Sequence, residues 1–228
     1  SEHTTDGRLR VSIPHSQMND FCIQRYALPT GESLLIHEKR DRSVLSLQDL
    51  VRHRSTKIDN TGNVCVWDCA LTLCWAVLQD NLSPNVVLEL GAGMAALMGL
   101  SLAVHQNDRG VKLYITDGQD SSVQNNKMHC HLMRAAAILR AETQCQVLMW
   151  NTETVMEPIS ADLTLIADCT HFTNYHAALL WTAVSHTRVG GSIWMCQPDR
   201  GNSWRLFQQL ILRVNQNTPL LDVSERTY

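Results

Sequence analysis

Two short runs near the start of the chain alternate between apolar and polar residues, at 21–26 (FCIQRY) and 33–37 (SLLIH). A Pro-Thr-Gly segment at 29–31 lies between them, and these residue types favour turns. Alternation with a period of two on both sides of a turn is typical of a β-hairpin. The polar stretch 46–62 predicts a connector, so residues 1–60 are expected to form an N-terminal β extension with its connector.

From residue 61 onward, short apolar runs alternate with longer segments of helical periodicity. Such alternation predicts an α/β fold with a mostly parallel sheet. We expect residues 61–228 to form one domain of this kind. The expected strands are residues 86–90, 111–116, 146–150, 161–167 and 191–196, with a further strand at 220–223, and the expected helices are residues 94–104, 120–140, 174–186 and 202–214.

The first strand of this domain ends in a glycine-rich turn, 86–93 (VVLELGAG). Glycine has no Cβ, so the backbone can approach a ligand closely there. Gly91, Gly93 and Ala96 match the dinucleotide pattern G-x-G-x-x-G/A, although such turns also occur without a ligand. Glu89 favours a different ligand, because its carboxylate would repel phosphates and attract the amino and sulfonium centres of S-adenosylmethionine.

Acidic and aromatic residues follow the other predicted strands. Asp117, with Gly118 after it, is placed to accept the ribose hydroxyls of an adenosine, although an aspartate can also cap the next helix. Trp150 offers an aromatic face near the adenine, or packs in the core. Asp168 lies where the group that accepts the methyl is expected, or caps a helix. Because the carboxyl ends of parallel strands share one crevice, we expect these residues to line one pocket.

Composition narrows the class of partner. The 228 residues contain 44% hydrophobic and 18% charged residues, which is ordinary for a globular protein. The net charge of −3 predicts no nucleic-acid partner. No run of 18 apolar residues and no charged-then-apolar leader occurs, so no membrane partner is expected. We expect a location in the cytoplasm, with the nucleus as a second location.

Eight cysteines are spread along the chain without a C-x-x-C pair. Most stand in apolar segments, which is typical of buried free thiols in a reducing compartment. Cys65, Cys69 and the His-Cys-His run at 129–131 fit no common zinc spacing, so no metal is predicted.

Several motifs together resemble the class I seven-β-strand methyltransferases of the protein-lysine branch, and within that branch the chain is most similar to the calmodulin-lysine methyltransferases. The resemblance covers roughly residues 20–215. Its motifs are GNVCVW at 62–67, ELGAGM at 89–94, TDG at 116–118, Asn125, WN at 150–151, ADC at 167–169 and PDRG at 198–201.

The resemblance implies a Rossmann-like sheet with an N-terminal β-hairpin extension. It implies transfer of methyl groups from S-adenosylmethionine to a lysine ε-amine of a protein substrate, with calmodulin the expected substrate. Asp168 would be the catalytic residue at the lysine channel. The residues expected to hold the cofactor are Trp67, Glu89, Gly91, Ala92, Gly93, Asp117, Gly118, Trp150 and Asp168.

The chain departs from the family pattern in four places, one of which is the stretch between Gln197 and Arg200, which is short of basic residues. The aromatic residue expected three positions after Asp168 is displaced, because His171 stands there and Phe172 follows. These two are expected to line the substrate channel, with a loop histidine that has no chemical role as the alternative for His171. The acidic and proline residues usual after Trp67 are replaced by Asp-Cys-Ala. After 220–223 too little sequence follows for a seventh strand, which is expected to be missing.

Three other functions stay open on the sequence. They are a methyltransferase of another protein or of a small amine, a nicotinamide-dependent oxidoreductase, and a cofactor-binding module without turnover. The glycine spacing permits the second, whereas Glu89 opposes its phosphates. The altered motif around Asp168 is the only support for the third.

Overall fold

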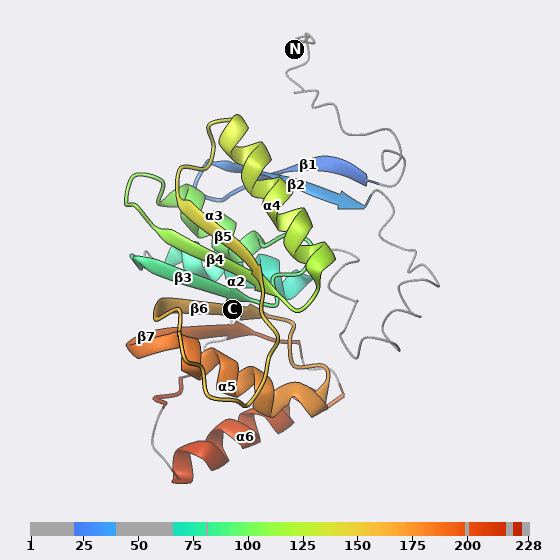
Figure 1. Ribbon diagram of the computed structural model, residues 1–228. Helices are drawn as coiled ribbons and strands as arrows, with labels where there is room; N and C mark the ends of the chain where they lie inside the picture. The colour runs from blue at the N-terminus through green and yellow to red at the C-terminus, as the bar shows by residue number, and fades with distance from the viewer. Residues whose placement is uncertain (1–20, 40–65, 81, 199–200, 218–220, 225–228) are drawn as a thin grey trace.

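The structure is a computed structural model that describes residues 21–39, 66–80, 82–198, 201–217 and 221–224 (Figure 1). The N-terminal elements are β1 (Phe21–Ala27), β2 (Ser33–Lys39) and α2 (Asp68–Gln79). The central elements are β3 (Val86–Leu90), α3 (Leu97–His105), β4 (Lys112–Asp117), α4 (Asp120–Ala135) and β5 (Glu142–Val147). The last are β6 (Ala161–Ala167), the short 3-10 helix η3 (Thr173–Tyr175), α5 (His176–His186), β7 (Thr187–Cys196) and α6 (Ser203–Asn217).

Five strands form one parallel sheet in the order β5-β4-β3-β6-β7, and β1 and β2 form a separate antiparallel hairpin. The chain runs outward from β3 to β4 and β5, and then crosses back to β6 on the other side of β3. The order therefore reverses between β3 and β6. Ligands of open α/β sheets bind at the carboxyl ends of the strands beside such a reversal. The expected α/β, Rossmann-like fold with an N-terminal hairpin is confirmed.

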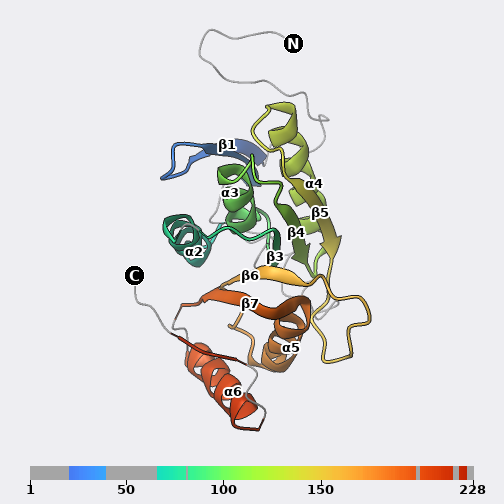
Figure 2. The same cartoon turned by 90° about the vertical axis from the view of Figure 1, so that its left-hand side faces the viewer.

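The two faces of the sheet bury different cores. Val87 of β3 packs in a core with α2, α3, α4 and the hairpin. Leu88 and Leu90, which point to the opposite face, pack with α5 and α6. This alternation is what a strand covered on both faces requires. Figures 1 and 2 show the hairpin and α6 on opposite sides of the sheet.

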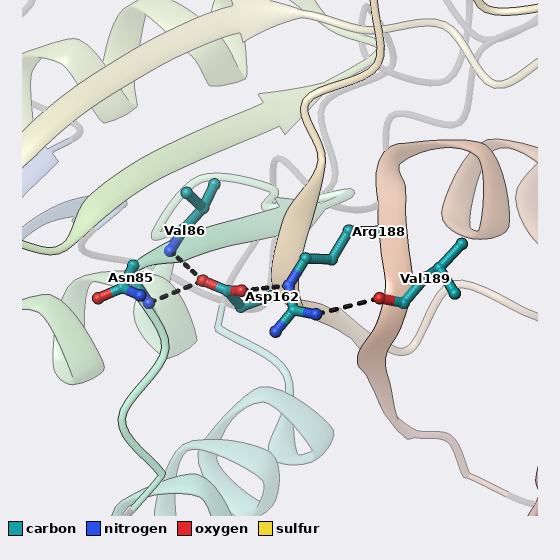
Figure 3. A network of polar contacts seen from close by, with 5 residues as sticks. All are labelled: Asn85, Val86, Asp162, Arg188 and Val189. Carbon is teal, nitrogen blue, oxygen red and sulfur yellow. Dashed lines mark hydrogen bonds and ion pairs between the residues drawn. The ribbon is translucent and has the colours of Figure 1, made fainter.

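A polar network joins three strands at the amino end of the sheet (Figure 3). The carboxylate of Asp162 accepts hydrogen bonds from the backbone N–H groups of Asn85 and Val86, both at 2.8 Å, and from Nε of Arg188. The hydrogen bond from Arg188 holds the pKa of Asp162 below its usual range. This network fixes the starts of β3, β6 and β7, far from the carboxyl ends where a ligand is expected.

Several predicted boundaries were wrong. The third strand of the sheet spans Glu142–Val147 rather than 146–150, so Trp150 lies beyond its end. This strand is at the sheet edge, and its exposed polar residues alternate with half-buried ones. Of the apolar residues that suggested 146–150, Val147 ends the strand and residues 148–150 form the following loop. Residues 221–224 are not in a strand, which contradicts the prediction for that part of 220–223.

The helices and the last strand differ less from prediction. The helix predicted at 94–104 begins at Leu97, because the turn continues to Ala96. The helix predicted at 120–140 ends at Ala135. The strand predicted at 191–196 begins at Thr187, with an irregular register beside β6 at a Gly-Gly pair. The connector at 46–62 and parts of the motifs at 62–67 and 198–201 lie outside the described residues.

Candidate active site

The turn after β3 is left-handed at three positions. The φ angles of Gly91, Gly93 and Ala96 are 66°, 57° and 44°. Glycine adopts this region without strain, which explains the first two residues. The turn is tied to the end of β4, because Ala92 N–H donates to the carbonyl of Thr116 at 3.0 Å.

Gly91 lies at the point where the strand order reverses. A Cβ atom on Gly91 would lie 2.7 Å from Sγ of Cys169 and 3.1 Å from Cζ2 of Trp150. Cys169 follows β6 and Trp150 follows β5, so residues from three strand ends converge on this glycine. The structure thus brings together three of the segments that the sequence singled out. It also excludes any larger side chain at Gly91.

The carboxyl group of Glu89 lies on the face of the sheet that α3 covers. It is 1% exposed, and its Oε2 accepts the N–H of Gly99 at 2.7 Å. Gly99 is the third residue of α3, and Ala96 at the N-cap position provides no side-chain cap. Glu89 therefore caps α3 from a neighbouring strand. A Cβ on Gly99 would lie 2.7 Å from that oxygen, so the contact requires glycine.

Burial raises the pKa of the Glu89 carboxyl to about 8, and the negative charge of Asp117 acts in the same direction. Backbone N–H groups of α3 act against this rise. Burial is the larger effect because a carboxylate loses its hydration in the core. The sequence predicted an ionised group that attracts a cation, whereas the structure has a buried group that is neutral near neutral pH.

Asp117 ends β4 beside the glycine turn. Its Oδ2 accepts the N–H of Gly93 at 2.9 Å, and its Oδ1 accepts the N–H of Gln119 at 2.8 Å. The N-cap residue of α4 is Gln119, so Asp117 does not occupy the capping position that was its alternative role. Asp117 and the adjacent Gly118 are half-buried. The glycine turn and the acidic end of β4 therefore form one hydrogen-bonded unit.

Side chains of α4 hold the other edge of the turn. Asn126 Nδ2 donates to the carbonyl of Gly93 at 2.9 Å, and Asn125 Nδ2 donates to the carbonyl of Met94 at 2.7 Å. Asn125 also donates to the carbonyl of His37 in the hairpin at 3.0 Å. His129, one turn further along α4, accepts the N–H of His37 at Nε2, 2.9 Å away.

Asn126, His129 and Gly99 were missed by the sequence analysis, and Asn125 was identified only through the resemblance. The sequence did contain a signal for the residues of α4, because Asn125, Asn126 and His129 stand at positions i, i+1 and i+4 and therefore lie near one another on the helix. Asn126 and His129 are fully buried, and such burial is unusual for these residue types unless they are hydrogen-bonded.

Asp168 follows β6 in a left-handed conformation, with φ of 53°. It is 9% exposed, and its N–H donates to the carbonyl of Cys196 at the end of β7, at 3.0 Å. The next N–H, of Cys169, donates to Oε1 of Gln197 at 2.8 Å. The N-cap residues of η3 and α5 are Phe172 and Tyr175, so Asp168 does not cap either helix.

Aromatic rings follow Asp168 in the loop. His171 and Phe172 have ring centroids 4.3 Å apart, and Phe172 meets Tyr175 edge-on at 6.4 Å. Nδ1 of His171 lies 3.1 Å from the carbonyl oxygen of Asp168, so the loop turns back on itself. Phe172, the displaced aromatic residue, is therefore one of three rings in the segment that follows Asp168.

Trp67 is the N-cap residue of α2, and its carbonyl accepts the N–H of Ala70 at 2.9 Å. Two residues later, the thiol of Cys69 forms a hydrogen bond with the thiol of Cys196. This bond lowers the pKa of Cys196, whereas burial and the charge of Asp168 raise it. The start of α2 is therefore close to the end of β7 and to Asp168.

A sequence model of a lysine methyltransferase family matches residues 48–213. The chain belongs to this family. Among solved structures, the chain is 14% identical to PH0226 protein from Pyrococcus horikoshii OT3 (TM-score 0.39, covering 63% of this chain and 60% of that one). It is 12% identical to SAM-dependent methyltransferases from Methanosarcina mazei (0.43, 60% and 64%) and 14% identical to cofactor-bound Rv0187 from MTB (0.45, 72% and 75%). The chain thus spans less than two-thirds of the first two proteins.

The sequence predicts S-adenosylmethionine as the cofactor, and the match to a lysine methyltransferase family agrees with this. The site fits it, because the turn beside the strand reversal presents two glycines in the left-handed region and an acidic group at the next strand end. The carboxylate of Asp117 disfavours the phosphates of a dinucleotide there, whereas the neutral Glu89 does not act on them. No group of three or more side chains able to bind a metal ion occurs in the described part of the chain. None of the described helices has the length and apolarity needed to cross a bilayer.

Proposed function

We propose that the methyltransferase transfers methyl groups to the ε-amine of a lysine in a protein, and that calmodulin is the substrate. The family match supports a lysine acceptor, and the resemblance of the site motifs supports calmodulin. The observation that carries the proposal is the convergence on Gly91. A Cβ atom on Gly91 would touch Sγ of Cys169, so Cys169 lies against the glycine turn. The neighbouring Asp168 is therefore beside the expected cofactor.

In this proposal the strand ends hold S-adenosylmethionine, which supplies an electrophilic methyl group on a sulfonium. Asp117 accepts the ribose hydroxyls with the lone pairs that its two backbone donors leave, and Gly118 leaves room beside it. The backbone of Gly91, Ala92 and Gly93 borders the amino-acid part. Trp150 packs its ring beside the adenine, because the ring already lies against Gly91.

Two further residues belong to the proposed cofactor site. Trp67 closes it from the start of α2, which Cys69 links to the end of β7. Glu89 acts as a positioning residue, because it fixes the start of α3 and therefore the end of the glycine turn.

Asp168 is the proposed catalytic residue. A lysine has a pKa of about 10.4 in water and must lose a proton before it attacks the methyl group. A nearly buried site favours the uncharged amine, and the Asp168 carboxylate would orient the amine and offset the positive charge that develops on nitrogen. His171 and Phe172 would line the channel through which the side chain enters, with their rings against its apolar stem.

The test is an assay with labelled S-adenosylmethionine and purified calmodulin, and a cell extract as a second acceptor. We expect label on a lysine of calmodulin with the wild-type protein. We expect Asp168→Ala to abolish transfer while S-adenosylhomocysteine binds within about tenfold of wild type, a difference of about 1.4 kcal/mol. Asp108→Ala is a matched control, because that carboxylate is 88% exposed and distant in the chain.

The outcomes separate the alternatives. Label on a lysine of another protein would mean that this protein, and not calmodulin, is the substrate, while the proposed reaction would stand. Cofactor binding without label on any acceptor would favour a binding module. If Asp168→Ala lost cofactor binding together with transfer, Asp168 would belong to the cofactor site alone. Binding of NAD in place of S-adenosylhomocysteine in a calorimetric titration would overturn the proposal.

A further inference from the structure

Two thiols face each other outside the active site. Cys130 of α4 and Cys145 of β5 are both free, and their sulfur atoms lie 3.8 Å apart. The two cysteines are fifteen positions apart in the sequence and form no recognisable cysteine motif, so only the fold brings them together. We propose that Cys130 and Cys145 form a redox-active dithiol, a site that a peroxide oxidises to a disulfide and that a reducing dithiol restores.

The geometry of the two elements suits bond formation. A disulfide needs sulfur atoms about 2.05 Å apart, so the two must approach by a little under 2 Å. Within the described part of the chain, β5 is an edge strand that pairs with β4 alone, and α4 packs directly beside it (Figures 1 and 2). An edge strand is held on one side only, so this approach disturbs the sheet less than it would in a central strand.

The surroundings favour a thiolate within the pair. Hydrogen bonding from Cys145 lowers the pKa of Cys130 to about 7; burial acts against this, and Thr143 and the positive charge of Arg134 add to the lowering. The same hydrogen bond raises the pKa of Cys145, so the two sulfurs share one proton. Arg134 is held beside them, because its guanidinium donates to Thr143 and to the carbonyl of Ala141. A thiolate is the form that reacts with oxidants.

Access comes from the side of β5. Cys130 is 3% exposed, whereas Cys145 is half-buried on the edge strand. We expect a small peroxide to reach the pair there. The thiolate attacks one peroxide oxygen, which breaks the O–O bond, gives a sulfenic acid and releases hydroxide. The second thiol then attacks the sulfenic sulfur, so that the disulfide forms and water leaves. The two sulfurs lose two electrons in total, and the peroxide gains them.

The test treats the reduced, full-length protein with hydrogen peroxide, blocks the remaining thiols with N-ethylmaleimide, and maps peptides without reduction. We expect one cross-linked species that joins the peptides of Cys130 and Cys145, with a loss of two hydrogen atoms in mass, and its disappearance after dithiothreitol. We expect Cys145→Ser to abolish the cross-link and to accumulate oxygen adducts on Cys130. Cys22→Ser removes another half-buried thiol and should leave the cross-link unchanged.

A second reagent tests the pair without oxidation. Phenylarsine oxide binds two neighbouring thiols, so it should protect Cys130 and Cys145 from N-ethylmaleimide in wild type and in Cys22→Ser, and should protect Cys130 no longer in Cys145→Ser. Full alkylation of both cysteines after peroxide would overturn the proposal, as would a cross-link that joins other cysteines only. The mapping of wild type decides this even if a variant fails to fold.

Discussion

Replacement of Glu89 by glutamine should change how stability depends on pH. In the folded protein, burial raises the pKa of Glu89 to about 8, whereas the ordinary value for an unfolded chain is 4.5. Between these values the folded state holds a proton that the unfolded state has lost. Rising pH therefore favours unfolding in this window, and the effect ends near pH 8, where both states are ionised. Glutamine is neutral and keeps an oxygen to accept the N–H of Gly99.

The size of the effect follows from the two pKa values. Each unit of difference corresponds to about 1.4 kcal/mol, so the full window amounts to about 5 kcal/mol. Integration from about pH 5 to about pH 8 gives about 3.5 kcal/mol, with a slope of about 1.4 kcal/mol per pH unit in the middle. We expect the free energy of unfolding of Glu89→Gln, minus that of wild type, to rise by this amount.

Urea unfolding followed by tryptophan fluorescence at several pH values measures this difference. Subtraction of the wild-type curve removes the contribution of every other group that titrates in the same range. Glu142→Gln is a matched control, because that side chain is 62% exposed, and its difference from wild type should show no such slope. Parallel curves for wild type and Glu89→Gln would mean that Glu89 is ionised in the folded protein, and would refute the reasoning.

Three other substitutions test the elements around the site. Gly99→Ala should lower the free energy of unfolding by about 1–3 kcal/mol in urea, because the added Cβ meets Glu89 and a leucine; an unchanged value would mean that α3 shifts freely. Burial lowers the pKa of His129 to about 4, so the unfolded state binds more protons between about pH 4 and 6.5. Falling pH should therefore destabilise wild type relative to His129→Gln by about 3 kcal/mol, and equal slopes would contradict this. The pKa of Asp162 is lowered by Arg188, so its contribution is present above the unfolded value and lost in acid. Asp162→Asn should lose about 1–2 kcal/mol near neutral pH, and this deficit should shrink as the pH falls below the unfolded value; a deficit that is the same in acid as at neutral pH would contradict it.

Sequence pattern predicted the central strands well because burial fixes their composition. β3 and β6 are covered on both faces, so most of their residues are apolar, and β6 was placed at the observed residues. The pattern failed for β5, where one face is exposed and polar residues alternate along the strand. The apolar residues 147–150 suggested a strand, yet Leu148 and Trp150 pack against the core beneath α5. An apolar run can therefore contain side chains that pack in the core from a loop, and not only from a strand.

The role of Glu89 depended on a contact that composition does not reveal. Its position near the end of an apolar strand correctly identified the glycine turn. Strand alternation places it on the same face as Val87, toward α3, and there it meets an N–H group that lies ten residues later in the chain. An acidic residue in this pattern predicts where the cofactor turn is. It does not by itself predict that the carboxylate touches the cofactor.

The glycine turn is held by segments from three parts of the chain, and this explains why local sequence could not predict its support. Asn125 is 88 residues from His37 and 31 from Met94, yet it donates to both carbonyls. The hairpin is therefore connected to the turn by two hydrogen bonds through one amide group. His37 donates its own N–H to His129, which accepts only while its Nε2 is unprotonated. Any change that displaces the hairpin thus acts on Asn125, and through it on the backbone that borders the proposed cofactor site.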